Sequence, residues 1–321
     1  MSADAAAVPF VRRHELSPEA AAYRARRKPS VPIEMPDLCD HAAVARWRAA
    51  TNALWGEDDD PQIPHRREEI GGVSCLVAGP PPDSGAPVVL YAHGGGYVLG
   101  SAAVATPITA RLGRTLRVVS VDYRQPPEHP FPAALDDILA VYQVLAAERG
   151  PAVPAAGDMP AAPAADGVPV ALAGDSSGGA LALSAAVVAT ARGARPAAVA
   201  LFSPLLDHAA VPGSPLVDGE GRCLINHYVG GADPADPRLS PLRANLSGLP
   251  GVLVQAGADE PLASQAVELQ ARAAAVGTNI TLELWEHLWH TWHYHHLPEA
   301  DQALTEAAAF LAALLSQPSG P

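Results

Sequence analysis

A serine framed by glycines is the residue of this chain best placed to act as a nucleophile. An apolar stretch over 170–173 leads into Gly-Asp-Ser-Ser-Gly-Gly at 174–179, and an Ala- and Leu-rich helical stretch follows. Glycines on both sides let a strand and a helix pass closely, so the serine oxygen stands clear of the sheet at a helix N-terminus, where negative charge is favoured. We therefore expect Ser176 to be the nucleophile. Ser177 competes with it, but the glycines frame Ser176.

Three consecutive glycines follow another apolar run. Residues 88–92 lead into His93-Gly94-Gly95-Gly96-Tyr97. Backbone N–H groups of such glycines can point into a cavity and stabilise the oxyanion of a tetrahedral intermediate, each contributing about 3–4 kcal/mol. A turn of this kind can also bind phosphate, but the Lys-Ser/Thr and G-x-G-x-x-G patterns of nucleotide sites are missing. The two remaining interpretations of this glycine turn are an oxyanion hole and a plain flexible turn.

Two adjacent carboxylates are available further along the chain. Asp259 and Glu260 follow the apolar run 252–256, at the edge of a parallel sheet where ligands bind. Either carboxylate could orient a histidine. The same pattern also fits a helix N-cap followed by Pro261 in the first turn.

Histidines are concentrated after the last apolar run, at 287–296. A catalytic base is expected there, because serine, acid and histidine follow one another in that order in α/β enzymes with such a serine turn. A pair such as His287 and His290 could bind zinc, but no carboxylate or cysteine is spaced to complete the site, so we expect neither a metal nor a cofactor. The five histidines are His287, His290, His293, His295 and His296.

Short β-branched runs alternate with helical stretches from residue 70 onward. This alternation is typical of a mostly parallel central sheet flanked by helices. The low-complexity segment 150–167 indicates a loop, and the irregular segment 207–250 is typical of a pocket wall or lid. Strands are predicted at 73–78, 88–92, 118–122, 168–173, 198–202, 252–256 and 280–285, and helices at 106–114, 132–149, 177–192, 261–276 and 298–315.

Composition and charge argue against nucleic acids and membranes as partners of this protein. The chain of 321 residues is 49% hydrophobic and carries a formal charge of −13, which repels nucleic-acid phosphates and anionic lipid. Three scattered cysteines form neither a disulfide framework nor a zinc site. The first residues lack the pattern of a signal peptide, and no apolar run reaches the roughly 18 residues of a membrane span. We expect a cytoplasmic protein without nucleic-acid or membrane partners.

In combination, these motifs resemble those of the hormone-sensitive-lipase-like esterases, the microbial family IV carboxylesterases. That family carries an H-G-G-G turn, G-D-S-A-G-G, D-E-x-L and a late H-x-F. The corresponding segments here are 93–96, 174–179 with Ser177 in place of alanine, 259–262 and 290–292. Further similar segments lie at 121–137, 230–234 and 236–241, so that the resemblance spans residues 70–315. A departure is His287, which stands where glycine is usual.

The resemblance implies an α/β-hydrolase fold and a role for each motif. Ser176 attacks the substrate carbonyl, His290 takes its proton, and Asp259 fixes the tautomer of His290. An alignment shifted by one turn would select His287 or His293 instead. The N–H groups of Gly95, Gly96 and Ser177 hold the oxyanion, with His93, Gly94 and Asp175 as supporting residues of the motifs.

The family also implies a helical cap over the site. Here that would be residues 1–60, with a contribution from 207–230, above a catalytic domain at 61–321. Tyr97, Leu224 and Tyr228, with Trp47 and Trp55, would line the substrate pocket. Each of these side chains fits an ordinary core position equally well.

The predicted activity is hydrolysis of small to medium acyl esters through an acyl-enzyme on Ser176. An amide deacetylase, a lactonase or an acyltransferase of a secondary-metabolic pathway would use the same three residues. A ligand-binding receptor on this fold is a further alternative, but such relatives tend to lose the histidine that is present here as His290. The expected partner is a small-molecule ester, and an edge-strand homodimer is compatible with the sequence, although nothing in it establishes one.

Overall fold

The computed structural model describes residues 10–12, 15–26, 35–55, 63–147, 168–209 and 220–316. The predicted loop at 150–167 lies outside the described residues. The same is true of residues 210–219, which belong to the segment expected to contribute to the cap.

One sheet of nine strands runs through the described part of the chain, in the order β1-β9-β8-β7-β6-β4-β5-β3-β2. β3 pairs antiparallel with β2 and β5, whereas all other neighbours are parallel. β4 to β7 are buried along their whole length, as parallel strands covered on both faces should be. The strands are β1 (Phe10–Arg12), β2 (His65–Ile70), β3 (Val73–Ala78), β4 (Val88–Ala92), β5 (Arg117–Val121), β6 (Val170–Asp175), β7 (Ala198–Phe202), β8 (Gly251–Gly257) and β9 (Ile280–Trp285).

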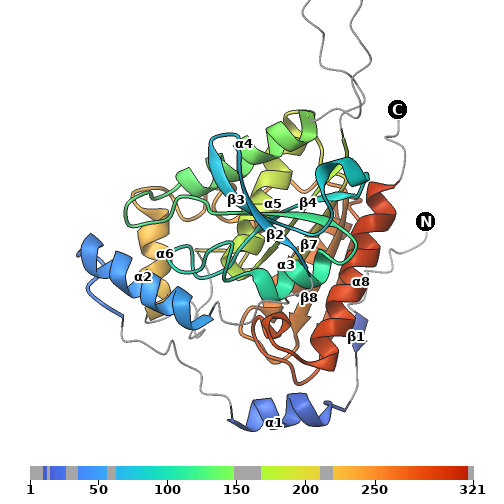
Figure 1. Cartoon of the computed structure of the whole chain (residues 1–321), viewed down its shortest axis with the longest axis horizontal. Coiled ribbons are helices and arrows are strands. Elements are labelled where there is room, and N and C mark those ends of the chain that lie inside the picture. Colours follow the sequence, from blue (N-terminus) through green and yellow to red (C-terminus); the bar gives the residue numbers. More distant parts are fainter. Residues whose placement is uncertain are drawn as a thin grey trace, which may run out of the picture.

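Helices cover both faces of this sheet (Figure 1). Alternate strand residues point to opposite faces, so Leu90 packs with the core under α4, α5 and α7, and Tyr91 packs with the core under α3 and α8. The helices are α1 (Pro18–Arg26), α2 (His41–Trp55), α3 (Thr106–Leu112), α4 (Ala133–Ala147), α5 (Ser176–Ala191), α6 (Glu220–Val229), α7 (Ala263–Ala274) and α8 (Pro298–Leu315), with 3₁₀ turns η1 (Pro82–Ser84), η2 (Pro241–Arg243) and η3 (Trp292–Tyr294).

The predicted parallel sheet flanked by helices is confirmed, and all seven predicted strands form with ends within two residues of the expected ones. The pattern did not reveal β1 and β2. β1 has only three residues, and β2 is a charged edge strand with the sequence His-Arg-Arg-Glu-Glu-Ile. An edge strand needs one hydrogen-bonded neighbour and is protected from further pairing by charged side chains, so its sequence lacks the apolar signal.

The predicted cap segment, residues 1–60, contributes to three places in the structure. β1 extends the sheet beside β9, and α1 packs through Ala20 against the C-terminal loop and α8. α2 packs through Trp47 on Val98 and Leu99, and α6 contributes Leu224 to the same cluster. Figure 1 shows α2 and α6 side by side, and α1 well apart from both.

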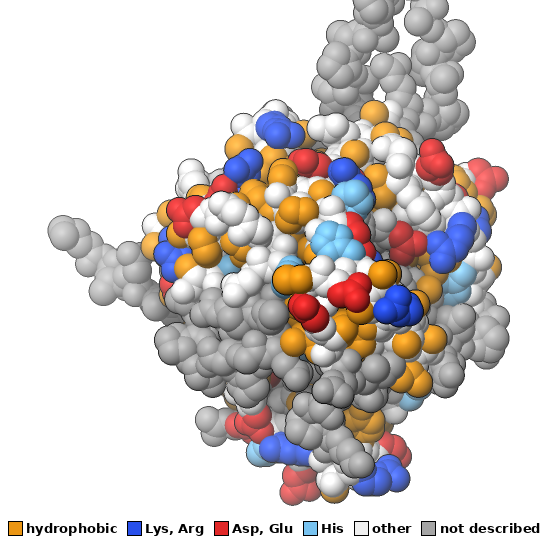
Figure 2. Space-filling model, turned by 90° about the vertical axis from the view of Figure 1, so that its left-hand side faces the viewer, with side chains coloured by type: hydrophobic (Ala, Val, Ile, Leu, Met, Phe, Trp, Pro, Cys, Tyr) orange, Lys and Arg blue, Asp and Glu red, His pale blue; other side chains and the backbone are white. Residues whose placement is uncertain are grey.

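Figure 2 shows the side of the molecule on which α2 and α6 lie in Figure 1. On the described part of this surface, hydrophobic side chains are interspersed with acidic, basic and histidine side chains. No helix of the described residues is long and apolar enough to cross a membrane.

Candidate active site

Ser176 occupies a sharp turn between β6 and α5. Its backbone has a φ of 50°, in the left-handed region that residues with a side chain rarely adopt. The turn is possible because glycines flank it: a Cβ on Gly174 would overlap the carbonyl of Gly178, and a Cβ on Gly178 would overlap the carbonyl of Ala92 in β4. The predicted geometry of a nucleophile turn is therefore present.

His290 reaches this turn from the loop after β9. Its Nε2 lies 2.9 Å from Ser176 Oγ, so that the hydroxyl can donate a hydrogen bond to a neutral imidazole. The imidazole is only 14% exposed. Two residues 114 positions apart thus meet at the carboxyl edge of the sheet, in the arrangement that proton abstraction from a serine requires.

The carboxylate beside His290 belongs to Glu260 and not to Asp259. Glu260 Oε2 lies 3.8 Å from His290 Nδ1, and its side chain is fully buried. Asp259 is 47% exposed, and its Oδ2 accepts a hydrogen bond of 3.1 Å from Arg24. Asp259 also lies 3.9 Å from Nδ1 of the exposed His287. The resemblance selected Asp259, but the turn after β8 directs that side chain to the surface and its neighbour inward.

Two donors hold the Glu260 carboxylate. Ser203 Oγ donates to Oε2 over 2.6 Å, and the N–H of Gly257 donates to the same oxygen over 3.3 Å. Within the described part of the chain, Glu260 Oε1 and His290 Nδ1 are buried without a hydrogen-bond partner. The 3.8 Å between His290 Nδ1 and Glu260 Oε2 is longer than a hydrogen bond, and catalytic hydrogen bonds are often long before substrate binds.

The glycine loop after β4 approaches the nucleophile from the other side. The N–H of Gly94 donates to Asp175 Oδ1 over 2.9 Å and so is already occupied within the protein. The backbone turns at the next two glycines. Gly95 and Gly96 have φ values of 119° and 60°, and Leu99 N–H donates to the carbonyl of Gly95 over 2.9 Å. Ser177 is the second residue of α5, where N–H groups lack partners within the helix.

Asp175 forms hydrogen bonds to several segments around Ser176. Its carboxylate is buried and accepts hydrogen bonds from Tyr91 OH (2.7 Å), from Gly94 N–H (2.9 Å) and from Tyr294 OH (3.1 Å). Burial raises the pKa of Asp175 above its ordinary value, while these hydrogen bonds act in the opposite direction. One side chain therefore connects β4, the glycine loop, the nucleophile turn and the η3 turn that follows His290.

His93 holds the glycine loop in place through its contacts with Gly94 and Tyr123. Its Nδ1 lies 2.8 Å from the carbonyl of Gly94, and its ring stacks on Tyr123 with centroids 4.2 Å apart. Tyr123 OH donates to the carbonyl of His93 over 2.7 Å. Burial lowers the pKa of His93 to about 4, so the ring is neutral near pH 7 and serves structure rather than proton transfer.

The predicted pocket residues differ in accessibility. Tyr97 and Tyr228 stack with ring centroids 3.7 Å apart and have almost no exposed surface. Tyr97 OH lies 2.6 Å from Nε2 of the buried His208. Leu224, by contrast, lies over the glycine loop, since a Cβ on Gly96 would be 3.2 Å from Leu224 Cδ1. The two tyrosines form a buried layer, and Leu224 is the member of the predicted set that contacts the loop directly.

The remaining histidines of the C-terminal loop are dispersed. His293 is buried between Phe202 and Trp292, whereas the ring of His295 packs at a tilt against Tyr23 of α1. In the part of the chain that the structure describes, no group of three or more His, Cys, Asp or Glu residues could hold a metal ion. His287 has a φ of 65°, which explains why glycine suits this position in the family motif.

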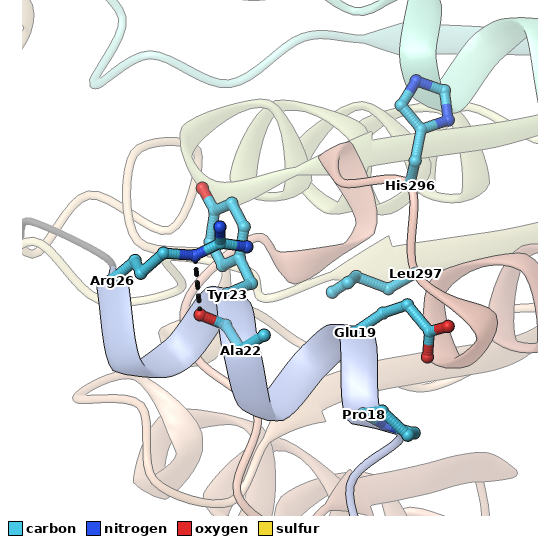
Figure 3. Close-up of a pocket in the computed structure, with 7 residues that line it drawn as sticks. All are labelled: Pro18, Glu19, Ala22, Tyr23, Arg26, His296 and Leu297. Atoms are coloured by element: carbon cyan, nitrogen blue, oxygen red, sulfur yellow. Dashed lines mark hydrogen bonds between the residues drawn. The ribbon is translucent and has the colours of Figure 1, made fainter.

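A cavity of about 440 Å³ lies between α1 and the C-terminal loop (Figure 3). Its lining includes Tyr23 and Arg26 of α1 and His296 and Leu297 of the loop, and none of the residues around Ser176. Figure 3 shows Arg26 turned back onto its own helix, where it donates to the carbonyl of Ala22 over 3.1 Å. This hollow is separate from the candidate active site.

Sequence reasoning missed Ser203, Tyr91 and Tyr294. Ser203 directly follows β7, so its place at the carboxyl end of a parallel strand was a usable signal. Neither tyrosine stands in a catalytic motif, and their contacts with Asp175 depend on tertiary packing.

Comparison with known proteins identifies relatives in sequence and in fold. Residues 89–294 match a family model described as the alpha/beta hydrolase fold. An acetyl-hydrolase of Streptomyces hygroscopicus is 36% identical over 241 residues, covering 70% of this chain and 74% of that protein. An esterase of Acinetobacter venetianus is 30% identical over 245 residues, covering 71% of this chain and 75% of that protein.

The crystal structure of an esterase from the bacterial hormone-sensitive lipase family superimposes with a TM-score of 0.76 at 30% identity, covering 94% of this chain and all of that one. A hormone-sensitive lipase from a metagenome library gives a TM-score of 0.75 at 27% identity, covering 93% of this chain and 96% of that one. The chain therefore belongs to the α/β-hydrolase family and, within it, to the hormone-sensitive-lipase-like esterases.

Proposed function

We propose that this enzyme hydrolyses carboxylic esters of small acyl groups through an acyl-enzyme on Ser176, with His290 as the base and Glu260 as the acid. The observation that carries the proposal is the 2.9 Å contact between Ser176 Oγ and His290 Nε2 at a strained strand-to-helix turn. The buried carboxylate of Glu260 on the far side of the imidazole supports the third role.

The first half of the reaction forms the acyl-enzyme. Ser176 Oγ attacks the carbonyl carbon while its proton passes to His290 Nε2. The carbonyl oxygen becomes an oxyanion that accepts hydrogen bonds from the N–H groups of Gly95, Gly96 and Ser177. Glu260 stabilises the imidazolium at Nδ1. The imidazolium then gives its proton to the departing alkoxide, which leaves as the alcohol.

The second half releases the acid. Water gives a proton to His290 Nε2 and attacks the acyl carbon, which produces a second oxyanion in the same site. Collapse of this intermediate breaks the bond to Ser176 Oγ, which recovers the proton from His290. The products are a carboxylic acid and an alcohol, and the enzyme returns to its starting state.

Packing around the glycine loop supports a short acyl group. Leu224 lies against Gly96, and the next residue, Tyr97, stacks on Tyr228 in a buried layer. In our proposal α2 and α6 are the cap, drawn from residues 1–60 and 207–230, above a catalytic domain at 61–321. The cluster of Trp47, Val98 and Leu224 supports this part. The name acetyl-hydrolase of the Streptomyces relative agrees with a short acyl chain.

We further propose that the enzyme acts in the cytoplasm on a diffusible ester, without nucleic acid or membrane as a partner. The formal charge of −13 supports this, because it opposes binding to polyanions and anionic lipid. An edge-strand homodimer stays a prediction, which gel filtration with light scattering tests.

A fluorophosphonate probe tests the nucleophile. Mass mapping should place the label on Ser176, and turnover of p-nitrophenyl acetate should fall by about 10⁴-fold or more in Ser176→Ala. Ser177→Ala is the matched control: it keeps the backbone N–H proposed for the oxyanion hole and removes only a hydroxyl, which accepts a hydrogen bond from the N–H of Tyr97, so the label should still form on Ser176. Turnover that survives in Ser176→Ala would refute the proposal. A series of acetate, butyrate and octanoate esters should show kcat/KM falling with chain length.

A further inference from the structure

Ser203 lies between the two strands that deliver the nucleophile and the acid. It follows β7, whose neighbours are β6, leading to Ser176, and β8, leading to Glu260. The side chain is fully buried, and the backbone N–H donates to the carbonyl of Gln255 over 2.8 Å. A hydroxyl at this point has no access to solvent, so its hydrogen bonds are made within the protein.

That hydroxyl contacts both the acid and the loop of the base. Ser203 Oγ donates to Glu260 Oε2 over 2.6 Å and accepts from the N–H of Thr291 over 3.1 Å. Thr291 is the residue directly after His290. One oxygen atom therefore links the carboxylate to the backbone that carries the imidazole, and its single proton is committed to the carboxylate.

The backbone on both sides of this link is strained. Ser203 has a φ of 48° and Thr291 a φ of 54°, values that are unusual for a residue with a side chain and most of all for a β-branched one. Such conformations persist only where the surroundings fix them, and they cluster at functional sites. The hydrogen bond between Ser203 and Thr291 joins these two strained residues.

We propose that Ser203 is a positioning residue, which sets the distance between Glu260 and His290; this rests on the proposed role of Glu260 as the acid. Without the hydroxyl, the only donor left on Glu260 Oε2 in the described structure is the more distant Gly257 N–H. The N–H of Thr291 would lose its acceptor as well. The acid and the base would then no longer be held together, although substrate contacts are unchanged.

Ser203→Gly isolates the hydroxyl from the strain, because glycine adopts a φ of 48° freely. We expect kcat for p-nitrophenyl acetate to fall about 10- to 100-fold, with KM unchanged within about twofold. Ser203→Ala keeps the backbone strain and should lower kcat by the same factor. Ser240→Gly is the matched control: it also removes a buried hydroxyl, one that hydrogen-bonds the carbonyl of Pro234 and both the N–H and the ring Nδ1 of His208, and it should retain kcat.

A double-mutant cycle separates this inference from the assignment of the acid. In a Glu260→Ala background, Ser203→Gly should lower kcat by less than about twofold, because a residue that acts through Glu260 has nothing left to position. Wild-type kcat in Ser203→Gly, or additive losses in the double variant, overturns the role of Ser203. Wild-type kcat in Glu260→Ala overturns the acid assignment itself, and thermal melts of each variant verify the fold.

Discussion

Asp259 and Glu260 are neighbours in the chain that lie in opposite environments. The side chain of Asp259 is about half exposed and pairs with Arg24, whereas that of Glu260 is fully buried against His290. A carboxylate stabilises an imidazolium more strongly when water is excluded, because the effective dielectric constant is lower. At the scale of single residues, burial rather than motif position is the reason to propose Glu260 as the acid.

Glu260→Ala should therefore lower kcat by about 10³-fold or more, as expected for loss of a triad member. Asp259→Ala should stay within about threefold of wild type, because it removes only a partly exposed ion pair. Both variants are assayed with the same p-nitrophenyl ester and checked by thermal melts. A larger loss in Asp259→Ala than in Glu260→Ala would restore the acid that the motif indicated.

The motifs brought Ser176 and His290 together but left the choice of acid open. Glycines around Ser176 and the chain order of the motifs led to a serine and a histidine that lie 2.9 Å apart in the structure. Spacing could not distinguish two adjacent carboxylates, since the direction of a side chain in a turn depends on the turn's own hydrogen bonds. Ser203 was missed because its place at the carboxyl end of a strand is a signal only once the strand order is known, and it stands in no catalytic motif.

At the scale of elements, the site depends on how closely α5 passes β4. A Cβ on Gly178 would overlap the backbone carbonyls of Ala92 and His93, and neither can move without disturbing the glycine loop. The glycine loop is in turn bound to the nucleophile turn through Gly94 and Asp175. The helix and the strand thus fix the distance between the turn of Ser176 and the glycine loop.

Gly178→Ala should destabilise the protein by several kcal/mol or prevent folding, since the added methyl meets backbone rather than a mobile side chain. Gly231→Ala is the control: its Cβ would meet nothing within 4 Å, and its backbone is not in the left-handed region. Urea unfolding of both variants gives the comparison. Equal stability of the two would show that α5 can move away from β4.

The central strands were easier to predict than the edge strands and the exact start of a helix. Continuous apolar runs marked the buried strands, because both faces of those strands contact helices. Edge strands β1 and β2 lack that signal. α7 begins at Ala263, two residues later than expected, because the chain first makes the turn that buries Glu260.

At the scale of the whole molecule, buried histidines couple the fold to pH. Burial lowers the pKa of His93 and of His208 to about 4 each, and lowers that of His293 well below its ordinary value. Unfolding exposes these rings, which then bind protons from about pH 6.5 downward. The unfolded state therefore takes up more protons, and the stabilisation present above pH 6.5 is lost as pH falls toward 4.

Two other effects act against this loss. The raised pKa of Asp175 makes the folded state bind a proton more readily at low pH, which favours folding as pH falls. Repulsion within a chain of formal charge −13 also weakens as pH approaches the isoelectric point near 5.3. Both effects remain when one buried histidine is replaced, so a comparison of variants isolates the contribution of that histidine.

We expect the free energy of unfolding of the wild type to decrease between pH 7 and pH 5, with roughly 2 kcal/mol of the decrease from His208 alone. His208→Gln should show a decrease smaller by about that amount, whatever its stability at pH 7, because glutamine binds no proton. His129→Gln is the control, because it makes the same replacement at an exposed histidine. Urea unfolding at pH 7, 6 and 5 provides the three curves. An identical decrease in His208→Gln and wild type would mean that water reaches this ring in the folded state, and that the layer of Tyr97, His208 and Tyr228 beneath the site is open.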